Sequence, residues 1–136
     1  MISILVVTHG NLGRELISTA ELIVGKQEQV DALGFFLSDS ADELQRKIRE
    51  KYESLEQGEG VLVLTDIFGG STSNSVAIAL KDKNYQCVTG VNLPVMIEAL
   101  LSRDEGSLKE LSLKCREVGI EGVKDLRAFM ELDMPV

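Results

Sequence analysis

The 136-residue sequence has no tryptophan, two tyrosines and four phenylalanines, so it offers little material for a surface that stacks nucleic-acid bases. Its net charge of −8 also argues against binding to a phosphate backbone, which requires a basic surface. No apolar run approaches the roughly 20 residues that cross a bilayer, and the N-terminus lacks a basic region with a cleavage site. These absences argue against a nucleic-acid partner and predict a cytoplasmic protein.

Cysteine is scarce, and the usual nucleotide motifs are missing. Cys87 and Cys115 lie outside any C-x-x-C or zinc-ligand spacing, so we expect two reduced, largely buried thiols and no metal site. Gly10 and Gly13 do not complete a G-x-G-x-x-G motif, and residues 66–74 lack the lysine of a P-loop. We therefore expect no cofactor.

The apolar residues are arranged in short runs that alternate with helical patterns. Residues 2–9 are typical of a strand buried on both faces, and they end on His9, the only histidine. Residues 61–65 form a second run of this kind and end just before Asp66. Strands that alternate with helices predict an α/β fold built from βαβ units.

Weaker signals complete a single domain over residues 1–136. We expect two further strands, at residues 30–36 and 86–91. Capping boxes begin helices at Ser40 and at Ser107. The remaining helices are expected after Gly10, after Ser71 and at residues 92–101. From Gly119 to the end the pattern weakens, and this segment fits a short strand or a frayed helix.

A flavodoxin-like, doubly wound sheet with strand order 2-1-3-4 is the topology that these units favour. In that order strands 1 and 3 are neighbours, and the topological switch point lies between their carboxyl ends, where ligands bind in such folds. Those ends carry His9 and Asp66. The topology therefore predicts that two residues far apart in the sequence meet.

A carboxylate beside an imidazole fixes the tautomer, because the Nδ1–H group donates to the carboxylate and Nε2 keeps its lone pair. Backbone N–H groups and hydroxyls at the helix starts are candidate contacts for an anion. The residues concerned are Ser71, Thr72 and Ser73 at the start of the helix after Asp66, and the residues that follow Gly10. An imidazole nucleophile beside such an anion site suits phosphoryl transfer through a phosphohistidine.

Two other functions remain open from these residues. Ser71, His9 and Asp66 are the three residue types of a hydrolase triad, although residues 69–73 do not match G-x-S-x-G. The same pocket would also suit a non-catalytic regulatory domain that binds a small anion.

Three motifs resemble the EIIA component of the mannose/fructose/sorbose family of the bacterial phosphotransferase system. They are residues 6–10, 64–74 and 90–94, and the similarity extends to residues 119–123. Some family members carry Trp and Pro where this chain has Phe68 and Thr72. The phosphotransfer subunit of dihydroxyacetone kinase is a related alternative, but the motifs are closer to the sugar branch.

The resemblance implies that His9 accepts a phosphoryl group from phospho-HPr and passes it to an EIIB component, which serves a membrane EIIC/EIID permease. It implies that Asp66 orients the histidine, that Ser71 lies beside the phosphoryl group, and that Gly69 and Gly70 allow close approach. It also implies a cytoplasmic homodimer in which residues 119–136 contribute an exchanged strand. The sugar is not implied, because EIIA does not contact it.

Overall fold

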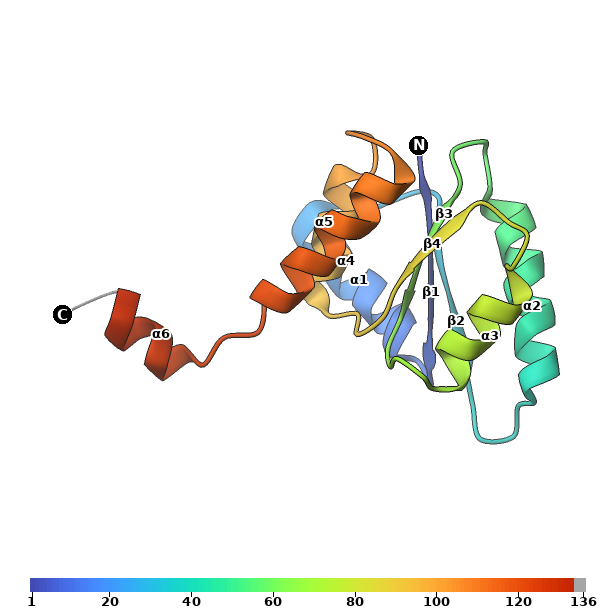
Figure 1. Cartoon of the computed structure of the whole chain (residues 1–136), viewed down its shortest axis with the longest axis horizontal. Helices are drawn as coiled ribbons and strands as arrows, with labels where there is room; N and C mark the ends of the chain where they lie inside the picture. Colours follow the sequence, from blue (N-terminus) through green and yellow to red (C-terminus); the bar gives the residue numbers. More distant parts are fainter. Residues whose placement is uncertain (134–136) are drawn as a thin grey trace.

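The computed structural model describes residues 1–133, which form a parallel sheet with helices on both faces (Figure 1). Its strands are β1 (Ser3–His9), β2 (Val30–Phe35), β3 (Val61–Thr65) and β4 (Tyr85–Val88). They are hydrogen-bonded in the order β2-β1-β3-β4, and all three pairings are parallel. The predicted α/β fold and its 2-1-3-4 strand order are confirmed.

Five helices cover the two faces of the sheet. α1 (Leu12–Val24), α4 (Leu93–Ser102) and α5 (Leu108–Glu121) pack on one face, and α2 (Ala41–Leu55) and α3 (Ser71–Ala79) on the other (Figure 1). Successive residues of β1 and β3 point to opposite faces, as in any strand. Both faces of these two strands are buried, which explains why their sequences are apolar without alternation.

Helix caps follow the sequence signals closely. Ser107 and Glu110 form a complete capping box, whereas only half of the predicted box is present at Ser40, whose side chain accepts a hydrogen bond from the N–H group of Glu43. The fourth strand is shorter than expected, since it ends at Val88 rather than at residue 91. Gly90 has a φ of +75°, which breaks the extended conformation there.

The C-terminal segment leaves the sheet and its covering helices. It holds a short helix, α6 (Leu126–Asp133), which extends away from the rest of the molecule (Figure 1). The expected strand exchange concerns a second copy of the chain, so it stays a prediction. Within residues 1–133, no helix is both long and apolar enough to cross a membrane.

Candidate functional site

The site lies at the carboxyl edge of the sheet, where β1 and β3 end side by side. Val7 pairs with Thr65, so the next residues of both strands emerge at the same edge. The backbone N–H group of His9 donates to Oδ2 of Asp66 at 2.8 Å. The same oxygen lies 2.9 Å from Nδ1 of the His9 ring. The two side chains therefore meet as the topology predicts.

The Asp66 carboxylate is almost enclosed, with 9% of its side chain exposed. Its second oxygen, Oδ1, accepts hydrogen bonds from the N–H group of Ile67 at 3.1 Å and from the Thr72 hydroxyl at 2.8 Å. Burial raises the pKa of Asp66, but the hydrogen bonds from His9 and Thr72 outweigh it, so the pKa lies below its ordinary value. The carboxylate is therefore ionised at neutral pH.

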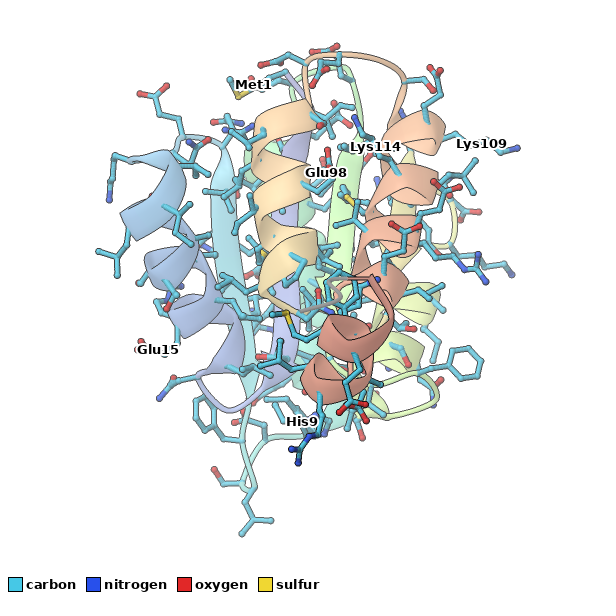
Figure 2. All side chains as sticks on the ribbon, turned by 90° about the vertical axis from the view of Figure 1, so that its left-hand side faces the viewer. Met1, His9, Glu15, Glu98, Lys109 and Lys114 are labelled. Carbon is cyan, nitrogen blue, oxygen red and sulfur yellow. The ribbon has the colours of Figure 1, made fainter. Side chains whose placement is uncertain are left out.

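An ionised carboxylate can only accept hydrogen bonds, so the contact with Asp66 requires a proton on Nδ1 of His9. In the neutral ring, Nε2 then carries the lone pair. The His9 side chain is 47% exposed and lies at the end of the molecule opposite Met1 (Figure 2). Its ring is nearly perpendicular to that of Phe35, with an interplanar angle of 81° and the ring centroids 5.9 Å apart. In this arrangement the Nε2 lone pair belongs to a ring that is about half exposed.

The loop between β3 and α3 passes directly beside the imidazole. A Cβ atom added to Gly70 would lie 3.8 Å from Cε1 of His9, in ordinary van der Waals contact, so Gly70 lies beside the ring. Gly70 is also the N-cap of α3, and Ser71 is its first residue. The first N–H groups of a helix have no intrahelical partner. The start of α3 therefore offers N–H donors next to His9.

Three of the predicted anion contacts are already occupied in the structure. The Thr72 hydroxyl donates to Asp66 and its side chain is fully buried, so it is not free to contact a phosphoryl group on Nε2. The N–H group of Gly10 donates to the carbonyl of Phe35, and that of Gly69 donates to Ser73 Oγ. Gly70, Ser71 and the backbone N–H group of Thr72, which lies in the first turn of α3, remain as candidate contacts.

The site shows no sign of a hydrolase triad or of a metal centre within the described residues. A triad would join the serine hydroxyl to the imidazole, but no hydrogen bond joins Ser71 to His9 in residues 1–133. Residues 1–133 also contain no group of three or more His, Cys, Asp or Glu side chains placed so that they could hold a metal ion.

A family model described as the PTS system fructose IIA component, EIIA-man, matches residues 3–115. The chain belongs to this family. It is similar to the fructose-specific EIIA component of Bacillus subtilis, with 32% identity over 82% of this chain and 77% of that protein. A crystal structure of the phosphotransferase system component EIIA from Streptococcus agalactiae aligns with a TM-score of 0.84 and 30% identity, over 94% of this chain and 99% of that one.

A longer relative of this EIIA-family chain is the mannose-specific EIIAB component of Escherichia coli, which is 38% identical over 129 residues. The match covers 93% of this chain and 40% of that protein. The EIIA-family chain therefore spans less than half the length of this relative.

Two contacts of the EIIA-family site were missed at the sequence level. The first is the bond from the His9 backbone N–H group to Asp66, and the second is the bond from Thr72 to Asp66. The sequence held one clue to the bond from Thr72 to Asp66: Thr72 lies in the first turn of the helix that follows Asp66. Helical periodicity identifies the buried face of a helix but not the hydrogen-bond partner of a hydroxyl on it.

Proposed function

We propose that the chain is a phosphocarrier of a sugar phosphotransferase system and that His9 carries the phosphoryl group. The donor is the phosphohistidine of HPr, and the acceptor is an EIIB component coupled to a membrane EIIC/EIID permease. The observation that carries this proposal is the contact of 2.9 Å between Nδ1 of His9 and Asp66, combined with an exposed ring. It supplies a solvent-facing lone pair of fixed orientation. Family membership supports a cytoplasmic location.

In the proposed transfer, the Nε2 lone pair of His9 forms a bond to phosphorus while the phosphorus–nitrogen bond of the donor breaks. The electron pair of that bond stays on the donor nitrogen, and the Nδ1 proton of His9 stays where it is. Attack through Nε2 gives the ring cationic character, which the ionised Asp66 at Nδ1 stabilises. The start of α3, at Gly70 and Ser71, supplies donors for the phosphoryl oxygens.

Apolar side chains around His9 provide a docking surface for a protein donor. Because β1, β2 and β3 end at the same edge, the residues that follow them lie at the same edge of the sheet as the imidazole. We define this apolar collar by its five exposed members, Leu12, Phe36, Leu37, Ile67 and Phe68. Exposed apolar residues that cluster around a reactive group are typical of a protein interaction site. We propose that HPr and EIIB dock on this collar with apolar surfaces of their own.

A groove beside β4 supports the proposed homodimer. It has a volume of about 760 Å³ and is lined by residues of α3, β4, α4 and α5, together with Val123 beyond the end of α5. β4 is an edge strand, whereas the outer edge of β2 is covered by Arg14, which donates to the carbonyl of Ala32. We propose that the segment 119–136 of a second copy occupies this groove as a strand beside β4, so that residues 119–121 and 126–133, which are helical in the single chain, become extended in the dimer.

The decisive experiment incubates the protein with phosphoenolpyruvate, enzyme I and HPr, using labelled phosphate. We expect one acid-labile, base-stable phosphoryl group per chain. Since His9 is the only histidine, His9→Ala removes every imidazole acceptor and is expected to abolish labelling. Undiminished labelling of His9→Ala would refute the proposal.

The remaining functions are less well supported. Relatives named as mannose- and fructose-specific components favour a sugar system over the phosphotransfer subunit of dihydroxyacetone kinase. A hydrolase would react with a fluorophosphonate at Ser71, and a regulatory anion-binding domain would retain a small anion without phosphoryl transfer. We expect neither result.

A further inference from the structure

The two oxygens of the Asp66 carboxylate have different partners. Oδ2 faces His9 and accepts from both its backbone and its ring. Oδ1 faces away from His9 and accepts from the Ile67 N–H group at 3.1 Å and from the Thr72 hydroxyl at 2.8 Å. The Ile67 bond joins adjacent residues of the loop. The Thr72 bond is therefore the one that ties Oδ1 to a different element, the helix α3.

The surroundings of Thr72 leave its hydroxyl little choice of partner. The residue is fully buried in the first turn of α3, so the hydroxyl cannot turn to solvent. The carboxylate carries no proton, so the hydroxyl is the donor in this contact. A buried hydrogen bond to a charged group is among the stronger polar contacts in proteins.

We propose that Thr72 is a positioning residue for phosphoryl transfer, because it holds Asp66 in the orientation that keeps the proton on Nδ1 of His9. Rotation of the carboxylate would move Oδ2 away from the ring, and Nδ1 would lose its acceptor. The proton would then distribute between the two ring nitrogens, and Nε2 would carry the lone pair for only part of the time. The Thr72 hydroxyl thus acts on the nucleophile through Asp66. The effect on rate rests on the proposed function; the effect on the tautomer does not.

The test replaces Thr72 with valine, which keeps the shape of the side chain and removes the hydroxyl. Thr65→Val is a matched control. Thr65 is also fully buried and directly precedes Asp66, and within the described residues its hydroxyl makes no hydrogen bond to Asp66 or His9. Thr72→Ser restores the donor and serves as the rescue variant. Each protein is measured in two ways: by the rate of phosphorylation from phospho-HPr, and by ¹⁵N NMR of the unphosphorylated His9 ring, which reports the tautomer.

We expect Thr72→Val to shift the ring ¹⁵N signals towards a tautomer mixture and to slow phosphorylation about ten-fold. Thr65→Val is expected to match the wild type in both measurements, and Thr72→Ser to recover most of the rate and the wild-type signals. If Thr72→Val does not fold, Thr72→Ala is measured in its place.

A wild-type tautomer in a folded variant without the hydroxyl would overturn the proposal, as would an equal shift in Thr65→Val. If the wild type is not phosphorylated at all, the proposed function fails. The NMR comparison still decides the role of Thr72 in that case, so the two failures are distinguishable.

Discussion

At the scale of single residues, the site depends on one carboxylate, that of Asp66, whose two oxygens each accept two hydrogen bonds from the protein. Asp66 accepts from the His9 N–H group, the His9 ring, the Ile67 N–H group and the Thr72 hydroxyl. These bonds fix the carboxylate relative to the imidazole, so the orientation of the ring does not depend on packing alone. Both strand ends contribute, because the His9 backbone itself is one of the donors.

Asp66→Asn tests the electrostatic part of this arrangement. The amide is neutral and its NH₂ group can face Nδ1, which would favour the wrong tautomer. We expect phosphorylation from phospho-HPr to slow by about a hundred-fold or more, while circular dichroism shows an unchanged fold. A wild-type rate in the folded variant would show that the carboxylate does not orient the histidine.

The lowered pKa of Asp66 also predicts how its contribution to stability depends on pH. The hydrogen bonds from His9 and Thr72 favour the charged form in the folded state, so the folded pKa lies below the unfolded value of about 4. The stabilisation is therefore complete above about pH 4 and is lost as the pH falls through the folded pKa. We expect the difference in unfolding free energy between wild type and Asp66→Asn, measured in urea, to shrink as the pH falls from 6 to 3. A difference that grows over this range would contradict the assignment.

At the scale of elements, predictability follows burial. β1 and β3 are buried on both faces and were recognisable as apolar runs, and the caps at Ser40 and Ser107 came from local chemistry alone. β4 was less well bounded because its residues are mostly half-buried at the edge of the sheet. The contact between His9 and Asp66 followed from topology, since strand order determines which ends are neighbours. The Thr72 contact did not follow, because it depends on a side-chain rotamer.

The reactivity of the two cysteines measures how tightly β4, which contains Cys87, and α5, which contains Cys115, are packed. Burial raises the pKa of the Cys87 thiol to about 11 and that of Cys115 to about 12. Little thiolate is therefore present at pH 8, and the thiolate is the reactive form. We expect slow reaction with Ellman's reagent in the native protein and fast reaction in urea, where thiols return to a pKa of about 8.5. Two equally fast equivalents in the native protein would show that these elements are loosely packed.

At the scale of the whole molecule, the two proposed interaction surfaces adjoin. The apolar collar lies at the same sheet edge as His9, and the groove is lined by residues of β4, α3 and α5. Phe68 belongs to both, since it is a collar member and also lines the groove. A second copy bound in the groove would therefore lie close to the docking surface of the donor.

Docking on the collar predicts a change in KM rather than in chemistry. Leu37 is fully exposed beyond β2 and makes no contact in the core, so Leu37→Asp places a charge on the surface without disturbing the fold. We expect the KM for phospho-HPr to rise about ten-fold or more, because the charge would be desolvated in the complex. Leu22→Asp is the control, since Leu22 is also exposed but lies near the end of α1, outside the collar. Equal effects of the two substitutions would rule out the collar as the docking site.

The proposed exchange of residues 119–136 between two copies predicts that the protein has the mass of a dimer in solution. Leu126 and Phe129 are exposed apolar residues on the segment that leaves the body of the chain. If this segment fills the groove of a second copy, the wild type sediments as a dimer, and the double substitution Leu126→Asp with Phe129→Asp sediments as a monomer. Leu22→Asp again serves as the control and stays a dimer. A monomeric wild type, or a double variant that remains dimeric, would exclude exchange through these residues.

The position of the phosphorus atom tests the proposed chemistry most directly. NMR of the protein after phosphorylation by phospho-HPr distinguishes the two ring nitrogens through their couplings to phosphorus and hydrogen. We expect phosphorus on Nε2 of His9 and a retained proton on Nδ1, hydrogen-bonded to Asp66. Phosphorus on Nδ1, or on a residue other than His9, would contradict the proposal that Asp66 selects the nucleophilic nitrogen.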